Sequence, residues 1–178
     1  MCIRDRLDPM VAGTLVSIAA SHGDAAMFDA FRAAAARATS PQDHERFLFA
    51  LTTFHNPALV ERALEESLSP ELRSQDTALY LASLFTNDLA RDRAWAFVKE
   101  HWRALQPKIA VSGGDTTFVS SLSAFCSAGA RDDIRAFVAA HPLPSAERAL
   151  SQTVERINNC VAFRERQQTT FSEWIAGQ

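Results

Sequence analysis

The chain is poor in the residues that mark fibrous, disordered and disulfide-rich proteins. Its 178 residues include six glycines, seven prolines and three cysteines, too few for a collagen-like repeat, a low-complexity chain or a disulfide scaffold. No apolar run approaches the roughly 20 residues that a membrane-spanning helix needs. The net charge of -3 gives no reason to expect nucleic acid or an anionic membrane as a partner. We therefore expect one folded chain with an ordinary core and no membrane segment.

The three cysteines are isolated along the sequence. Cys2, Cys126 and Cys160 form no C-x-x-C pair, so we expect neither a zinc knuckle nor a disulfide framework. Cys126 and Cys160 stand among apolar residues. We interpret both as small hydrophobic side chains buried in the core.

The first six residues fit no secretory signal, because they lack an apolar region and a small-residue cleavage site. A cytoplasmic location is the corresponding expectation. The string from Met1 to Arg6 resembles translated sequencing-adapter sequence. We predict that residues 1–6 are non-native or disordered, and that residues 7–178 form a single helical-repeat domain, a C-terminal fragment of a larger protein. An independent reading of the same locus that began with the same six residues would contradict this hypothesis.

Catalytic motifs are also missing. A zinc hydrolase needs two histidines four residues apart with a glutamate general base, but Leu48 stands where His44 would need its partner. No G-x-S-x-G nucleophile motif occurs. The run Gly113-Gly114-Asp115 lacks the lysine of a phosphate-binding loop, and we interpret it as a loop in which Asp115 caps the next helix. We expect no catalytic residue and no metal ligand in this chain.

The sequence is rich in helix signals instead. Asp8, Ser40, Asn56 and Ser69 each precede a proline, the pairing of a cap residue with the first helical position. Apolar residues recur at helical spacing throughout, and no stretch alternates with the period of a strand. The predicted helices span residues 9–22, 24–38, 41–54, 57–67, 70–86, 90–105, 115–127, 130–140 and 145–176. Breaks are expected as alternatives near Ser74 in the fifth and near Phe163 in the last.

Short connections between these helices predict that neighbours run antiparallel. Only the link over residues 106–115 is longer. The fold class we predict is all-α, with about eight to ten helices in antiparallel pairs stacked as a HEAT- or armadillo-like α-solenoid.

One segment is familiar. The run from Arg93 to Leu105, R-A-W-A-F-V-K-E-H-W-R-A-L, resembles the a-W-x-F-v-k-x-x-W-x-x-L element in the C-terminal helical domain of the puromycin-sensitive and endoplasmic-reticulum aminopeptidases. These enzymes belong to the same gluzincin family as aminopeptidase N. Further segments are similar to the family's in the same order, so that the resemblance covers residues 45–176: Leu72–Asp76, Phe125–Ser127, Ile134–Val138 and Glu147–Ile175. Phe163 departs from the family, which commonly has tryptophan there.

The resemblance implies a function that the residues alone do not. In the family this domain is a bowl of helix pairs that closes over a thermolysin-like zinc domain, bounds the peptide cavity and moves between open and closed forms. The zinc motif His-Glu-x-x-His and the Gly-x-Met-Glu-Asn motif lie upstream of it, and neither occurs here. The implied cofactor is zinc in a catalytic domain that is missing here. The implied partners are that domain and a peptide substrate.

Two sets of residues stand out against this background. The polar turn of Arg73, Gln75 and Asp76 is our candidate for a substrate-cavity or hinge patch, and the alternative is a helix–helix corner in which Asp76 caps the next helix. The family-marker core is predicted to comprise Trp95, Phe97, Trp102, Leu105, Phe137, Ile157 and Trp174.

A second function remains open. The same helix pairs could form a free-standing scaffold that binds a protein or peptide on its concave face. A scaffold of this kind is expected to be monomeric and stable alone, whereas exposed apolar surface on the first helix favours the fragment.

Overall fold

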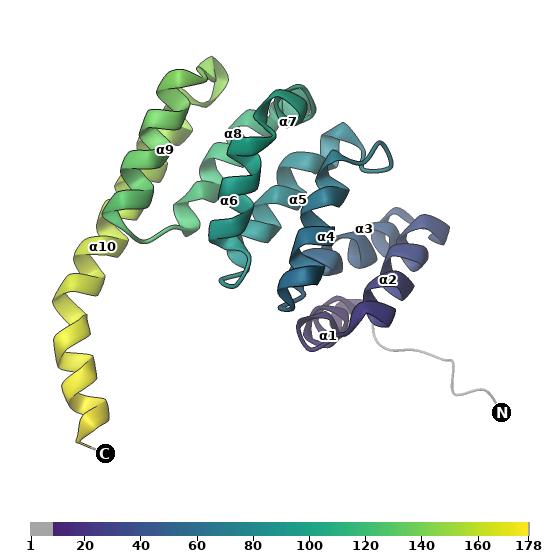
Figure 1. The fold of residues 1–178 in the computed structure, drawn as a ribbon, viewed down its shortest axis with the longest axis horizontal. Coiled ribbons are helices and arrows are strands. Elements are labelled where there is room, and N and C mark those ends of the chain that lie inside the picture. The colour runs from purple at the N-terminus through teal and green to yellow at the C-terminus, as the bar shows by residue number, and fades with distance from the viewer. Residues whose placement is uncertain (1–8, 178) are drawn as a thin grey trace.

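A computed structural model describes residues 9–177 and shows an all-helical array (Figure 1). The predicted fold class is confirmed: within the described range there are ten α-helices, four short 3-10 helices and no strand. The expectations for residues 1–6 and for the cap at Asp8 lie outside the described residues. None of the described helices is long and apolar enough to cross a lipid bilayer.

The α-helices are α1 (Pro9–Ser21), α2 (Ala25–Arg37), α3 (Pro41–Ala50), α4 (Pro57–Leu68), α5 (Ser74–Thr86), α6 (Arg91–Glu100), α7 (Trp102–Ile109), α8 (Gly114–Ser121), α9 (Ala128–Ala140) and α10 (Glu147–Ala176). The 3-10 helices are η1 (Leu51–Thr53), η2 (Val111–Gly113), η3 (Leu122–Ala124) and η4 (Pro144–Ala146).

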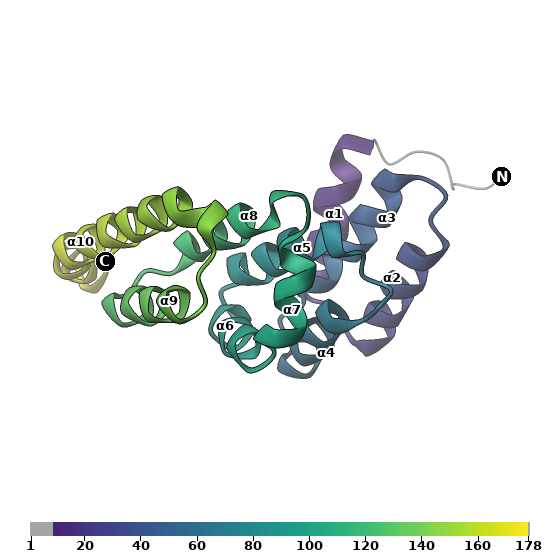
Figure 2. The ribbon, with the colours of Figure 1, turned by 90° about the horizontal axis from the view of Figure 1, so that it is seen from above.

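The helices lie in two layers, which Figure 2 shows from above. The first layer contains α1, α3, α5, α8 and α10, and the second contains α2, α4, α6 and α9. The short α7 follows α6 and lies against α5. Apolar packing joins the first layer, as where the Phe49 ring of α3 lies 6.3 Å from the Tyr80 ring of α5.

The second layer is joined by ion pairs and, between α6 and α9, also by the Trp95 and Phe137 rings, whose centroids lie 5.0 Å apart. Arg32 of α2 pairs with Glu66 of α4, Arg93 of α6 pairs with Glu61 of α4, and Lys99 of α6 pairs with Asp133 of α9, the last two at 2.7 and 2.6 Å. Long side chains span wider gaps than apolar contacts do. We therefore expect the array to curve toward the first layer, which would then form its concave side.

Local cap chemistry explains two of the predicted helix starts. The Ser40 hydroxyl accepts from the Asp43 backbone N–H at 3.1 Å, and the Asn56 side-chain oxygen accepts from Ala58 N–H at 2.9 Å. The predicted helix start at Ser69 and Pro70 was wrong. Ser69 accepts from the Glu71 N–H in a turn, and α5 begins only at Ser74, so Pro70 starts no helix.

The region around residues 101–115 also differs from the prediction. The expected helix over 90–105 divides at His101, and α7 continues through Pro107 to Ile109. The chain then turns through Ser112 and Gly113, which have positive φ values of 55° and 77°. Gly113, not Asp115, is the N-cap of α8. A Cβ atom on Gly114 would lie 2.1 Å from the Ile109 carbonyl oxygen, so only glycine fits there.

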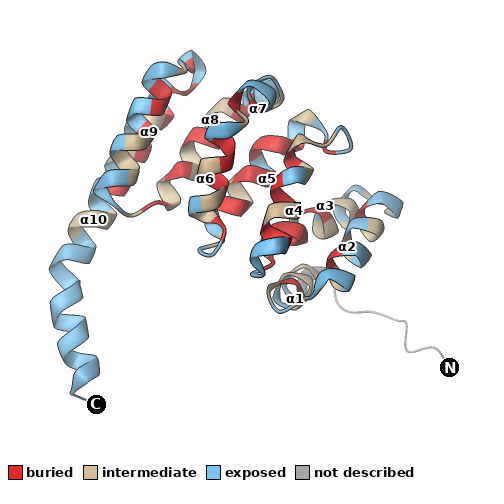
Figure 3. Cartoon of the chain, viewed as in Figure 1, coloured by how far each residue is buried: buried red, intermediate tan, exposed pale blue. Residues whose placement is uncertain are grey.

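The last helix is longer than expected. α10 runs unbroken from Glu147 to Ala176, and no break occurs near Phe163. Its first half lies against α8 and α9. Its second half extends beyond the other helices with every described side chain from Phe163 onward exposed (Figure 3).

The predicted core residues fall into two groups. Six of the seven are buried: Trp95, Phe97, Trp102, Leu105, Phe137 and Ile157. Trp174 lies in the second half of α10 and is 61% exposed, so in the described chain it is not a core residue. Trp174 continues the apolar spacing of the core residues along α10, which is why it was predicted to be buried. No other described helix reaches this part of α10 to cover it.

Trp95 is held by a polar contact as well as by packing. Its indole N–H donates to Asp133 Oδ2 at 2.6 Å, and Lys99 Nζ donates to the same oxygen at 2.6 Å and lies 5.5 Å from the indole ring. The hydrogen bonds from Lys99 and Trp95 lower the pKa of Asp133, although partial burial opposes them. The aromatic core is thereby tied to the ion pairs of the second layer.

The two cysteines of the core region form a disulfide bond, which we did not expect. Cys126 follows η3, Cys160 lies in α10, and their Cα atoms are 5.4 Å apart. Both are only half-buried, so their interpretation as unbonded buried hydrophobes was wrong. The two cysteines are 34 residues apart in the sequence, so no local pattern predicts that they pair. They meet because α9 folds back beside α10 and brings the two sulfur atoms together.

We predict that the double variant C126S/C160S loses about 2–4 kcal/mol of unfolding free energy, because the disulfide closes a 34-residue loop in the unfolded chain. Urea unfolding without reductant measures the difference. Dithiothreitol serves as the control, since it should lower the midpoint of the original chain to that of the variant and leave the variant unchanged. Equal midpoints without reductant would contradict the prediction.

Candidate functional site

Two adjoining hollows mark the first-layer face between α1, α3 and α5. Their volumes are about 450 and 310 Å³, and both are lined by Ser17 of α1, Thr53 of η1 and Ser83 of α5. We call them together the hydroxyl-lined groove. Its walls carry six hydroxyl side chains: Thr14, Ser17, Ser21, Thr53, Ser83 and Thr86.

Hydrogen bonds within the groove favour binding over catalysis. Ser21, Thr53 and Thr86 donate to backbone carbonyls of their own helical turns at 2.7–2.8 Å. Each of these oxygen atoms keeps its acceptor lone pairs. Because the hydroxyls donate to carbonyls and not to a general base, they are not arranged as activated nucleophiles. The groove can accept N–H groups from an extended ligand.

The two ends of the groove differ in charge. Glu45 and Arg46 of α3 stand at one end, and His55 and Asp88 stand at the other beside Asn87. The Asn87 amide donates to the carbonyls of Thr52 and Phe54 at 2.9 and 3.0 Å, which fixes this end of the groove to η1.

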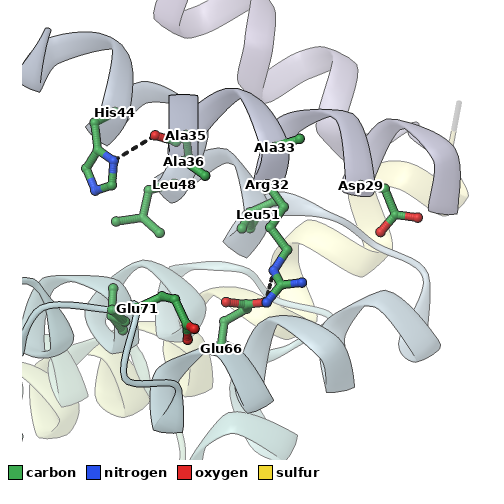
Figure 4. Close-up of a pocket in the computed structure, with 11 residues that line it drawn as sticks. Asp29, Arg32, Ala33, Ala35, Ala36, His44, Leu48, Leu51, Glu66 and Glu71 are labelled. Carbon is green, nitrogen blue, oxygen red and sulfur yellow. Dashed lines mark hydrogen bonds and ion pairs between the residues drawn. The ribbon is translucent and has the colours of Figure 1, made fainter. Parts of the chain in front are cut away.

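A third hollow of about 640 Å³ lies between α2, α3 and α4 (Figure 4). We call it the ion-bridged pocket. Figure 4 shows Arg32 reaching from α2 to Glu66 of α4, and the His44 Nδ1 atom lies 2.9 Å from the Ala35 carbonyl oxygen. Alanines on α2 leave space that larger side chains would fill. This pocket is a consequence of the wide second-layer spacing.

The predicted polar turn lies beside this pocket but does not line it. Arg73 Nε donates to Asp76 Oδ2 at 2.6 Å, and Asp76 is only 6% exposed. Gln75 is exposed between them. Asp76 is not the N-cap of α5, a place that Arg73 takes; it lies in the first turn, where a negative charge is favourable. The structure thus joins Arg73 with Asp76 and leaves Gln75 apart.

The resemblance assigns zinc to the catalytic domain, and the described residues of this chain offer it no site. Within residues 9–177, no three histidine, cysteine, aspartate or glutamate side chains gather into a group that could hold a metal ion. His44 is engaged with the Ala35 carbonyl. No reaction step through zinc can be derived from this chain.

No local sequence pattern indicates the hydroxyl-lined groove. Ser17, Thr53 and Ser83 are polar residues on amphipathic helices, a pattern that ordinarily indicates a solvated face. They adjoin only because α1, η1 and α5 meet in the first layer. A helical wheel of α5 would place Ser83 and Thr86 together, but no local signal connects them to α1.

We predict that Asp76→Ala lowers the unfolding free energy by about 1–2 kcal/mol, because it removes a partly buried charged hydrogen bond in the first turn of α5. Gln75→Ala, the matched control in the same turn, should change it by less than about 0.5 kcal/mol. Urea unfolding compares the two. An equal loss in both variants would contradict a structural role centred on Asp76.

Comparisons with known proteins agree with this architecture. Residues 3–159 match the family described as ERAP1-like C-terminal domain. The chain is 32% identical over 117 residues to aminopeptidase M1-B of Oryza sativa and 31% identical over 118 residues to aminopeptidase M1 of Arabidopsis thaliana, covering 65% and 66% of this chain. It is 29% identical over 116 residues, 63% of the chain, to the alanine/arginine aminopeptidase of Saccharomyces cerevisiae. Each match spans only 13% of the relative's length. The chain belongs to the ERAP1-like C-terminal domain family and corresponds to a C-terminal helical domain of the aminopeptidases.

Proposed function

We propose that this chain is the part of a zinc-dependent aminopeptidase that encloses the peptide cavity and gates access to the catalytic domain. Family membership supports the assignment, as do relatives that are named aminopeptidases. Zinc and the catalytic residues belong to the remainder of the polypeptide. The peptide substrate and the catalytic domain are the partners of this chain.

The observation that carries the proposal is the surface of α1, the helix at one end of the array. α1 contains no charged residue in the 13 positions from Pro9 to Ser21. Val11, Leu15 and Ile18 follow the spacing of one helical face and are 47%, 42% and 54% exposed. The ends of free-standing helical arrays have polar outer faces, because nothing covers them. α1 has instead the apolar stripe of an interior helix, which supports the proposal that further structure packs on it in the whole polypeptide.

The same surface argues against the free-standing scaffold. A stable, monomeric scaffold would require a capping helix with charged residues facing water, and α1 has none. The exposed stripe is the feature that we expected of a fragment. A scaffold function has no comparable observation in its favour.

The hydroxyl-lined groove is the proposed wall of the peptide cavity. It lies on the first-layer face, which we expect to be the concave side of the array. Its hydroxyl groups accept N–H groups of a peptide backbone whatever the peptide's side chains, and shielding that peptide from water requires no catalytic residue here. Closure of such a wall can gate turnover.

The location of the protein stays a prediction. The cytoplasm was our expectation from the missing signal sequence. The bond between Cys126 and Cys160 bears against it, because disulfides persist mainly in oxidising compartments.

We expect the reading frame upstream of residue 7 in the gene to encode His-Glu-x-x-His with a distant glutamate, and Gly-x-Met-Glu-Asn. Sequencing that region from an independent source tests the proposal. An intact upstream frame that lacks both motifs would end it.

We further predict that Ser83→Trp in the full-length enzyme raises KM for a peptide of eight to ten residues about three- to tenfold, a loss of about 1 kcal/mol in binding, because the indole fills the groove. KM for an aminoacyl anilide should stay the same, since this small substrate does not reach the wall. Glu65→Trp, on an exposed position of α4, is the matched control. Equal effects of Ser83→Trp on both substrates would exclude the groove as a peptide wall.

A further inference from the structure

The second half of α10 has no visible structural role in this chain. Phe163–Ala176, which we call the arm, is exposed along its whole length and extends from the array at the end opposite α1 (Figures 1 and 3). The family match ends at residue 159 and so does not cover the arm. A helix of this length gains little stability by itself, and Thr169 and Thr170 are weak helix formers.

The arm nevertheless carries a concentrated apolar surface. Phe163, Phe171, Trp174 and Ile175 are 53–61% exposed and fall within one third of the helix circumference, at 100° per residue. The rings of Phe171 and Trp174 are stacked, with centroids 6.2 Å apart and planes at 21°. Phenylalanine and tryptophan in such a cluster are typical anchors of protein interfaces.

The base of the arm is fixed in direction. Cys160 lies one helical turn before Phe163, and its disulfide ties α10 to Cys126. Arg164 Nη1 donates to the Cys126 carbonyl at 3.3 Å. A helix anchored at its base is pre-organised for docking, since less freedom is lost when it binds.

We propose that the arm docks, through Phe171 and Trp174, into an apolar groove on the catalytic portion of the same polypeptide. This inference rests on the proposed function. The charges of the arm are balanced, with Arg164 and Arg166 against Glu165 and Glu173. It therefore lacks the basic face that binds an anionic membrane.

The size of the surface favours an intramolecular partner over a second copy. Aromatic side chains bury ~150–250 Å² each, so the two anchors Phe171 and Trp174 together offer on the order of 300–500 Å². Two arms paired with one another would stay below the roughly 1,200 Å² of a stable interface between separate molecules. Within one polypeptide the effective concentration reaches millimolar values, and a small apolar contact suffices. The relatives, of which this chain matches 13%, have ample further chain to provide it.

The arm is also placed to contact a region that α1 does not. α1 and the arm stand at opposite ends of the array (Figure 1). Structure that packs on the apolar stripe of α1 would extend the array at that end, whereas the arm would contact the catalytic portion at the other end. Docking of the arm would hold the far end of the wall against the catalytic portion.

Hydrogen–deuterium exchange on the full-length enzyme tests the proposal. We expect the amides of residues 165–176 to be protected, and Phe171→Ala combined with Trp174→Ala to accelerate their exchange at least tenfold. The matched control is Thr169→Ser with Ser172→Thr, on the opposite face of the same helix, which keeps the summed helix propensity nearly constant and should leave exchange unchanged. Light scattering should give one molecular mass for all three proteins.

Three results would overturn the inference: unprotected arm amides in the original enzyme, protection that survives loss of both aromatic side chains, or a dimer that the aromatic variant converts to monomer. The last would identify a second copy as the partner. Failure of the proposed function is a separate result, because it is decided by the upstream zinc motif and by aminopeptidase turnover. An active enzyme with an unprotected arm would refute only the docking.

Discussion

Aromatic rings from both layers meet at the centre of the array, and the arrangement of the other helices depends on their contact. Trp95 of α6 lies 5.0 Å from Phe137 of α9, and Trp102 of α7 lies 5.0 Å from Phe137 and 5.7 Å from Phe118 of α8. Phe85 of α5 adds contacts at 6.0 Å to Phe118 and 6.4 Å to Trp95. One cluster thus joins five helices. Such rings bury large areas and fix mutual orientation, so α5 to α9 form the least deformable part of the domain.

The two layers around this cluster are built from interactions of unequal stiffness. Apolar contacts of the first layer are close-packed, and changes in their spacing are costly. In the second layer, α2, α4 and α6 are linked by ion pairs such as Arg32–Glu66 and Arg93–Glu61, which are partly exposed and contribute about 0–1 kcal/mol each. Long side chains can follow a change in helix spacing at little cost. Bending of the array is therefore expected to change the spacing of α2, α4 and α6 in the second layer, while the groove on the first layer keeps its shape. This property suits a wall that moves as a unit.

The sequence predicted those features that depend on neighbours along the chain. The caps at Ser40 and Asn56, the all-α class and the burial of Trp95 and Trp102 follow from spacing and local hydrogen bonds. The same local rules placed the start of α5 at Pro70, because a serine before a proline can cap a helix. In the structure the Ser69 hydroxyl accepts a hydrogen bond within a turn instead. The local rules missed the Cys126–Cys160 bond and the groove at Ser17 and Ser83, since both join segments that only the stacked helices bring together. Trp174 shows the limit most clearly: helical periodicity identifies an apolar face but not what covers it.

What covers the apolar faces decides between a wall and a free-standing scaffold. The rings of the cluster from α5 to α9 cover one another, whereas most of the exposed large apolar side chains lie at the two ends, on α1 and on the second half of α10. In an isolated array both ends would favour association, because exposed apolar surface drives it. In a larger polypeptide the same ends fix the array at two separate places, with the rigid centre and the hydroxyl-lined groove between them. A curved wall held at both ends confines what lies in front of it, and for that task it needs no catalytic residue of its own.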